Sequence, residues 1–298
     1  MNELISFLQN QDVEYQIGKI LSSCTAVGIG GRSKLFISPD SSEKLIKTLG
    51  FLSENKLQFN LGGNMSNVLP RDIEVHTPLV STLRVSKVEF SGDLVFAECG
   101  TLFSRLILLA SKRFLGGCEA LFGIPGTVGA MLYNNAGAYG GAISDFLETV
   151  DVYDPTDNST VRLKREEVGF FYRDSELKRQ KLAVIGATFR LNPSDKREIE
   201  AKLKEIRKNR ANSQPLELKN LGSVFKRTES LPASYIIDRC GLKGARVGKI
   251  SVSDKHAGFF VNEGGGTAED FLKLCDIVKS KVREKYGVVL EEEFEYLS

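Results

Sequence analysis

Hydrophobic and polar residues alternate over several short stretches of the chain, and a spacing of two residues predicts strands. In Lys34–Ser38 the alternation ends at Pro39, whose missing amide interrupts strand pairing. Further strands are predicted at Leu57–Leu61, Val85–Phe90, Leu94–Glu98, Val150–Tyr153, Thr160–Leu163, Ala183–Leu191 and residues 288–298. Most of these segments are short, and helical patterns lie between several of them.

A spacing of three to four residues between apolar positions predicts helices. Ser41–Asn55 carries Leu45, Leu49 and Leu52 at this spacing and begins with a serine, a favourable N-cap residue. Further helices are predicted at residues 1–15, Leu102–Lys112, Lys196–Arg210 and Ala268–Tyr286, the last stopped by Gly287. Strands interrupted by helices in this manner favour an α+β fold.

Turn-forming and charged segments divide this pattern into three parts. The first is a small βαβ-like region, residues 1–75, and the second, residues 76–195, ends at a turn cluster beginning with Asn192-Pro193. The third, residues 196–287, opens with a charged helix. We expect the C-terminal strand, residues 288–298, to belong with the first part.

Composition narrows the classes of function. The chain has 298 residues, with 40 basic against 38 acidic side chains, which is too balanced for a dedicated nucleic-acid binder. Two histidines exclude a multi-histidine metal centre, and five cysteines without a C-x-x-C pair indicate free thiols in a reducing cytosol. With no signal peptide and no apolar run near the ~20 residues that span a bilayer, we expect a soluble cytoplasmic protein.

Glycine is unusually frequent: there are 28, where average usage predicts roughly 21. Two glycine-rich turns, Gly62–Asn67 and Gly123–Gly129, the second followed by Asn135–Gly141, expose backbone amides that form anion-binding nests. Two such nests could hold a diphosphate between them, although each could also be a tight turn only. A Rossmann fingerprint is rejected at Gly28–Gly31, because Ser33 replaces its last glycine, and no P-loop is present.

Six motifs follow one another along the chain: GIPGTVG, NAGAYGG, FYRDSEL, QPLELKNLGSVFKR, GLKGARVGKISVSDKHAGFFVN and LEEE. Their order resembles that of the UDP-N-acetylenolpyruvoylglucosamine reductase (MurB) family. The resemblance runs from about Thr25 to Glu293 and leaves no room for an inserted substrate loop, as in the shorter subtype of that family. Six motifs in one order are far more specific than any one of them.

The resemblance implies an FAD enzyme with a fold of the vanillyl-alcohol-oxidase type. FAD would bind noncovalently between subdomains 1–75 and 76–195, and residues 196–287 would bind the substrate. NADPH would supply a hydride that reaches the enolpyruvyl double bond of UDP-N-acetylglucosamine enolpyruvate through FAD, giving UDP-N-acetylmuramate, a peptidoglycan precursor. We expect a monomer whose partners are the UDP-sugar and NADPH, with no nucleic acid or membrane.

The resemblance also implies three catalytic residues, each with an alternative explanation. Arg173 would bind the substrate carboxylate and stabilise the enolate, since guanidinium pairs with carboxylates through two bonds; otherwise it is a surface arginine. Ser223 would donate the proton; otherwise it is a loop serine. Glu293 would share a proton or orient the enol form, with Glu291, Glu292 and Glu295 as competing candidates if the register differs.

The predicted cofactor residues follow from the same motifs, and no metal site is expected. They are Gly62, Gly63, Asn64, Met65, Ser66, Asn67, Gly123, Ile124, Pro125, Gly126, Thr127, Gly129, Asn135, Ala138, Tyr139 and Gly140. Met65 stands where the family has a glycine. If that position requires a positive φ, the methionine costs roughly 1 kcal/mol or more. Covalent attachment of flavin through His256 is disfavoured, because the family binds FAD noncovalently.

Two other functions stay open from the residues. A related FAD-dependent oxidase acting on another alcohol or amine would consume oxygen and would not need Arg173, Ser223 and Glu293 together. A nucleotide-binding regulator with an eroded flavin site would be colourless when purified. The visible absorption spectrum, with and without NADPH, separates these alternatives from the reductase.

Overall fold

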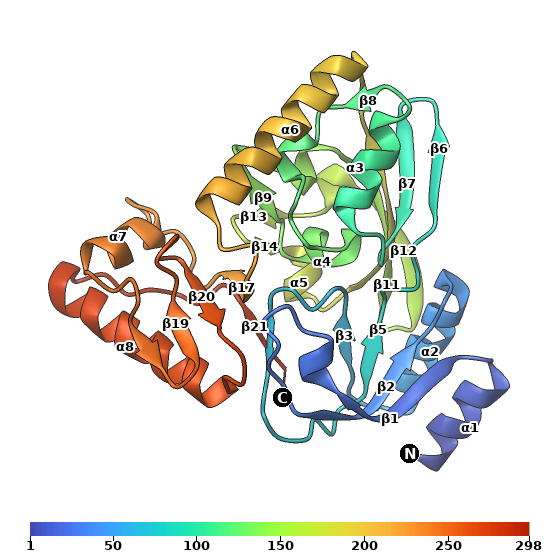
Figure 1. Ribbon diagram of the computed structural model, residues 1–298. Helices are drawn as coiled ribbons and strands as arrows, with labels where there is room; N and C mark the ends of the chain where they lie inside the picture. Colours follow the sequence, from blue (N-terminus) through green and yellow to red (C-terminus); the bar gives the residue numbers. More distant parts are fainter. Residues whose placement is uncertain (298) are drawn as a thin grey trace. The chain divides into compact units, whose positions relative to one another are not determined.

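The structure is a computed structural model that describes residues 1–297; Ser298, the last residue of the predicted 288–298 strand, lies outside the described residues. Helices and strands are mixed along the chain, as the α+β prediction requires (Figure 1). The chain divides into two units, each with its own core. The first unit comprises Met1–Ile17, Leu35–Asn64 and Thr77–Lys208, and the second comprises Gly18–Lys34, Met65–His76 and Asn209–Ser298.

The largest sheet of the first unit is antiparallel and has the strand order β12-β11-β15-β7-β6. Its strands are β6 (Val88–Ser91), β7 (Leu94–Glu98), β11 (Leu147–Asp154), β12 (Ser159–Lys164) and β15 (Ala183–Arg190). All five lie at or near predicted strand segments. The central strand β15 is buried over most of its length, which explains its continuous run of apolar and small residues.

A second sheet has the order β1-β2-β5-β3, and its β2–β5 and β3–β5 pairs are parallel. Its strands are β1 (Glu14–Ile20), β2 (Arg32–Ser38), β3 (Asn60–Gly62) and β5 (Leu79–Ser81). The strand β3 runs directly into the first glycine turn. β1 was not predicted: the helix expected over residues 1–15 ends earlier, because Asp12 adopts a positive φ of 50° and the chain turns into the sheet.

Helices α3 and α4 lie beside the antiparallel sheet of the first unit (Figure 1), and α4 packs on β15. The helices of this unit are α1 (Asn2–Asn10), α2 (Ser42–Glu54), α3 (Phe103–Ser111), α4 (Val128–Tyr133) and α5 (Glu176–Arg179); α6 (Lys196–Ser213) passes from this unit into the second. Ser41 caps α2 by accepting a hydrogen bond from the Lys44 amide at 3.2 Å, as predicted.

Short elements connect these larger ones. They are β8 (Leu115–Gly116), η2 (Glu119–Leu121), β9 (Gly137–Ala138), β10 (Gly141–Ala142), η3 (Ile143–Asp145), η4 (Arg165–Glu167), β13 (Phe170–Phe171), β14 (Asp174–Ser175) and β16 (Asn192–Pro193). The pairs β9–β10 and β13–β14 are small hairpins. Both hairpins carry residues that the sequence assigns to the functional site.

The second unit contains a four-stranded antiparallel sheet with the order β17-β20-β19-β18. Its elements are η1 (Leu21–Ser23), β4 (Val68–Pro70), β17 (Lys219–Ser223), α7 (Ala233–Arg239), β18 (Arg246–Val247), β19 (Ile250–Val252), β20 (Phe259–Asn262), α8 (Ala268–Tyr286) and β21 (Glu295–Leu297). The helix α8 has the predicted bounds. It packs on β18 and β19 through a buried stripe that includes Phe271, Leu274 and Val278.

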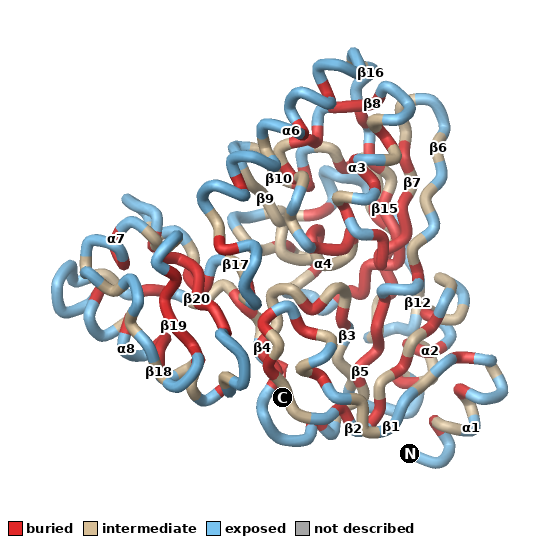
Figure 2. The backbone as a smooth tube through the Cα atoms, viewed as in Figure 1, coloured by how far each residue is buried: buried red, intermediate tan, exposed pale blue. Residues whose placement is uncertain are grey.

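Each unit has a separate apolar core. In Figure 2 the buried positions follow β7 and β15 in the first unit and β19 and β20 in the second. The C-terminal strand is shorter than predicted, since only Glu295–Leu297 is regular strand and Glu292 forms an isolated bridge with Phe225. β21 pairs in parallel with β4, which brings this segment beside the residues that follow the first glycine turn.

Candidate active site

Within the first unit, Gly63 and Asn64 of the first glycine turn lie against the second glycine turn. Asn64 donates from Nδ2 to the Pro125 carbonyl at 2.8 Å. A Cβ placed on Gly63 would overlap Thr127 Oγ1, so only glycine fits at this position. The sequence-predicted residues Gly62–Asn64 and Gly123–Gly129 therefore belong to one site in the first unit.

Several amides of the second turn are already used within the protein. Gly123 donates to Ser104 Oγ, Ile124 to the Leu121 carbonyl and Gly129 to the Cys99 carbonyl. A Cβ on Gly129 would lie 3.1 Å from Cys99 Cβ, so this glycine also permits close packing. These three residues shape the turn, and contact with an anion through their amides would require those bonds to be replaced.

Two buried oxygens beside these turns fit a polar ligand. Thr127 is fully buried, and its Oγ1 has no hydrogen-bond partner among residues 1–297. The Asn135 Oδ1 atom is also buried and has no hydrogen-bond partner within the described chain. A buried polar atom without a partner is costly, so such atoms commonly mark a bound group. The orphaned oxygens and the close approach at Gly63 are consistent with a bound FAD.

The loop from Asn135 to Gly140 forms a hairpin turn. Tyr139 and Gly140 connect β9 to β10, with φ values of 51° and 84°. Positive φ at both central residues is the geometry of a type I′ turn, which matches the twist of a hairpin. The Tyr139 side chain is about half exposed. Ala138 lies beside it on β9.

Arg173 lies in the turn of the adjacent β13–β14 hairpin, at a φ of 55°. Its Nη2 donates to the Gly137 carbonyl at 3.0 Å, and its guanidinium carbon lies 5.2 Å from the Tyr172 ring centre. In return, Asn135 Nδ2 donates to the Phe171 carbonyl at 2.9 Å. The predicted catalytic arginine is thus bonded to the predicted cofactor loop, and the alternative of an isolated surface arginine is disfavoured.

Ser223 ends β17 in the second unit, directly after a β-bulge. Gly222 has a φ of 82°, and its amide donates to Asn220 Oδ1 at 2.9 Å. Bulges redirect side chains and are frequent next to active sites. The Ser223 side chain is exposed. The bulge depends on long-range pairing with β20 and was not predicted from the sequence.

The backbone of Glu293 lies beside that of Val224, the residue after Ser223. Its amide donates to the Val224 carbonyl at 2.8 Å, and its carbonyl accepts from Asn67 Nδ2 at 3.0 Å. Asn67, predicted as a cofactor residue, thus makes a contact that the sequence did not suggest. Met65 adopts a φ of 49° and is buried, so the strain expected at this position is present.

The competing glutamates have partners elsewhere in the second unit. Glu292 pairs with Lys279 at 2.7 Å and accepts from Tyr296 Oη at 2.8 Å. Burial, followed by this bond to Glu292, raises the pKa of Tyr296. Glu291 forms an exposed pair with Lys226 at 3.3 Å.

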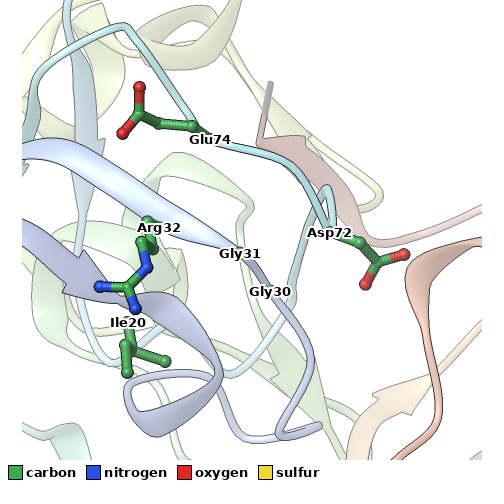
Figure 3. A pocket seen from close by; sticks show the side chains of 6 residues that line it. All are labelled: Ile20, Gly30, Gly31, Arg32, Asp72 and Glu74. Carbon is green, nitrogen blue, oxygen red and sulfur yellow. The ribbon is translucent and has the colours of Figure 1, made fainter.

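A surface pocket of about 350 Å³ in the second unit includes none of the predicted residues. It is lined by Ile20, Gly30, Gly31, Arg32, Asp72 and Glu74. Figure 3 shows the three charged side chains pointing in different directions. Asp72 accepts hydrogen bonds from the Ala268 amide at 2.9 and 3.0 Å, which caps α8. This pocket therefore lacks the converging groups of a catalytic site.

No group of histidine, cysteine, aspartate and glutamate side chains within residues 1–297 is arranged to hold a metal ion. Over the same residues, no helix has the length and apolar character needed to cross a membrane.

The chain is similar to known proteins over most of its length. Residues 33–164 match a family model described as an FAD binding domain, and residues 214–297 match the C-terminal domain of UDP-N-acetylenolpyruvoylglucosamine reductase. A reductase of that name from Thermotoga maritima is 41% identical over 276 residues, covering 92% of this chain and 96% of the relative. One from Clostridium novyi is 37% identical over 291 residues, covering 98% and 94%.

Solved structures show the same fold. The crystal structure of UDP-N-acetylenolpyruvylglucosamine reductase (MurB) from Thermus caldophilus superposes with a TM-score of 0.80 at 30% identity, over 96% of this chain and 99% of that one. An alkyldihydroxyacetonephosphate synthase, at 14% identity and a TM-score of 0.51, shares the fold over 65% of this chain and 40% of its own. The α+β prediction with an FAD-binding module is confirmed, and the chain belongs to the UDP-N-acetylenolpyruvoylglucosamine reductase family.

Proposed function

We propose that this chain reduces UDP-N-acetylglucosamine enolpyruvate to UDP-N-acetylmuramate with NADPH and FAD, and that Arg173, Ser223 and Glu293 are its catalytic residues. The observation that carries the proposal is the direct backbone bond between Glu293 and Val224, the residue after Ser223. It lies in the segment that matches the reductase's C-terminal domain. An acid and a hydroxyl on adjacent backbones suit delivery of one proton.

The chemistry requires a hydride and a proton to be added across the enolpyruvyl double bond. The residues of the two glycine turns would hold FAD, which would supply the methylene carbon with a hydride derived from NADPH. Arg173 binds the substrate carboxylate and stabilises the negative charge that develops at the α-carbon, because guanidinium stays protonated and forms two parallel bonds. Ser223 donates its hydroxyl proton to that carbon. Glu293 shares the proton or orients the enol form.

The residues of the two glycine turns hold the cofactor. Gly63 allows close backbone approach, and Thr127 and Asn135 offer buried oxygens that can accept hydrogen bonds from FAD or, in the case of the Thr127 hydroxyl, donate one. Ser66, Met65 and Asn67 complete the first turn. The remaining predicted residues, including Tyr139, line the flavin.

We also infer the domain division, the oligomeric state, the cellular location and the partners of the enzyme. Residues 1–75 with 288–298 form one FAD subdomain, residues 76–195 form the other, and residues 196–287 bind the UDP-sugar. The parallel pairing of β21 with β4 supports grouping the C-terminal strand with the first subdomain. The enzyme acts as a monomer in the cytoplasm, where NADPH and the UDP-sugar are its partners.

The decisive test is Ser223→Ala, with the exposed Ser230→Ala as the matched control. Stopped-flow absorbance under anaerobic conditions separates reduction of the flavin by NADPH from its reoxidation by the sugar nucleotide. We expect Ser223→Ala to keep the first step and to slow the second by about 100-fold or more, the scale of a lost general acid. Ser230→Ala should keep both.

Three other outcomes would contradict this assignment. If Ser223→Ala leaves both steps intact, Ser223 is not the proton donor. If the purified protein is colourless, the eroded regulator is favoured. If NADPH-reduced protein reacts with oxygen but not with the sugar nucleotide, the related oxidase is favoured.

A further inference from the structure

Asn67 connects the end of the first glycine turn to the segment that carries Glu293. Its side-chain Nδ2 donates to the Glu293 carbonyl at 3.0 Å, and its own carbonyl accepts from the Glu295 amide at 2.9 Å. The two bonds bracket Phe294, which is buried in the core of the second unit. Asn67 therefore forms hydrogen bonds to the backbone on both sides of Phe294.

The segment that carries Glu293 also forms backbone hydrogen bonds to the residues that follow Ser223. Glu293 donates its amide to the Val224 carbonyl, and Lys226 donates its amide to the Glu291 carbonyl, both at 2.8 Å. The preceding side chain, Glu292, is anchored to Lys279 on α8. The peptide groups of Glu293 are thus bonded on one side to Val224, the residue after Ser223, and on the other side to Asn67.

The Asn67 contact depends on the chemistry of the amide side chain. Carboxamide nitrogen donates hydrogen bonds, whereas an ionised carboxylate only accepts them. An aspartate at this position would place a negative oxygen against the Glu293 carbonyl oxygen and repel it. Asn67→Asp therefore changes a few atoms and reverses the sign of this one interaction.

We propose that Asn67 is a positioning residue that fixes Glu293 beside Ser223, in addition to its place in the cofactor turn. The inference rests on the proposed role of Glu293. Through this bond the first glycine turn and the catalytic acid form one continuous hydrogen-bonded structure. A shift in the turn would displace the acid, and displacements near 1 Å are enough to slow an enzyme about 100-fold.

The test uses the flavin-loaded enzyme and measures the two half-reactions separately in Asn67→Asp. Asn212→Ala, an exposed asparagine on α6, is the control. We expect reoxidation by the sugar nucleotide to fall about 10- to 100-fold more than reduction by NADPH, with a changed pH profile for reoxidation. Asn67→Ala removes the hydrogen-bond donor without adding a charge, so its rate of reoxidation should fall less than that of Asn67→Asp. If Asn67→Asp fails to fold, the same two half-reactions measured in Asn67→Ala test the positioning role.

A double-mutant cycle with Glu293→Gln decides the mechanism. If Asn67 acts through Glu293, Asn67→Asp causes little further loss once Glu293→Gln is present. Equal losses in both backgrounds, or a parallel loss of reduction by NADPH, would overturn the positioning role and leave Asn67 a cofactor residue only. If Glu293→Gln alone leaves reoxidation unchanged, the proposed role of Glu293 fails first, and the positioning role fails with it.

Discussion

Backbone strain at single residues coincides with the predicted site. Within residues 1–297, nine non-glycine residues have a positive φ, and four of them were predicted as site residues from the sequence. These four are Met65, Asn135, Tyr139 and Arg173. Strained conformations of this kind persist where the surrounding structure enforces them, and they cluster at functional sites. The hydrogen bonds of Asn135 and Arg173 to each other's loops supply that enforcement here.

The strain at Met65 can be measured with two substitutions. Met65→Ala and Met65→Gly both remove the buried side chain, but only glycine relieves the left-handed backbone. We expect the glycine variant to be more stable than the alanine variant by about 1 kcal/mol, the reverse of the usual order. Urea denaturation of both variants measures this difference. If alanine is the more stable, the turn does not impose a positive φ on residue 65.

His256 gives a pH dependence to stability. Burial lowers the pKa of His256 below its usual 6.5, and its Nδ1 accepts a hydrogen bond from the Gly258 amide at 3.1 Å, which requires the neutral ring. Because the folded-state pKa is depressed, this group stabilises the fold above pH 6.5, and the stabilisation is lost as the pH falls towards the folded-state value.

We therefore expect the free energy of unfolding to fall less between pH 7.5 and about pH 5.5 in His256→Gln than in the wild type. Denaturant titrations at a series of pH values measure this. His76→Gln removes the chain's other histidine, whose side chain is 73% exposed, and is the matched control that should follow the wild-type curve. A His256→Gln curve parallel to the wild type would contradict the assigned role of burial.

Elements with strong local signals could be predicted from the sequence. β7 and α8 have the predicted bounds, because the alternation in Leu94–Glu98 and the capping residues around α8 are local features. β1 and most of the short strands were not predicted, since β1 begins inside the segment assigned to a helix (residues 1–15) and two-residue strands depend on distant partners. The bulge before Ser223 was not predicted for the same reason, because it exists only through pairing with the distant strand β20.

The C-terminal end of α8 offers a clean test of helix termination. Gly287 has a φ of 67°, and its amide donates to the Arg283 carbonyl, while a Cβ there would meet no atom within 4 Å. Gly287→Ala should therefore destabilise the protein by about 1 kcal/mol through backbone conformation alone. Thermal unfolding of Gly287→Ala and Gly287→Asn checks this, because asparagine tolerates the left-handed conformation better. Equal stability of all three proteins would contradict it.

At the scale of the whole molecule, the order of the motifs was enough to propose the glycine turns, Arg173, Ser223 and Glu293 as site residues, and these roles stay predictions. Several contacts of these segments could not be predicted. The bonds that link Asn64 to Pro125 and Asn67 to Glu293 join segments far apart in the chain. No local spacing encodes such long-range pairs, so only the folded structure could show them.

Cofactor binding should be visible in the stability of the whole chain. A ligand that binds only the folded state raises the unfolding temperature, and FAD at about 100 times its dissociation constant should raise it by on the order of 5 °C. Gly63→Ala should abolish most of this shift, because its Cβ would overlap Thr127 Oγ1. Gly50→Ala, whose Cβ would meet only the Asn158 side chain, at 3.1 Å, is the control. An undiminished shift in Gly63→Ala would place FAD elsewhere.

The parallel pairing of β21 with β4 has a consequence for biosynthesis. Residues 68–70 leave the ribosome long before residues 295–297, so the newly made chain must wait for its final segment before this strand pair can close. Asn67 and Glu293 meet only at that stage. Premature translation stops or proteolytic trimming upstream of Glu293 would thus yield chains that still contain both glycine turns but lack Glu293, the proposed catalytic acid.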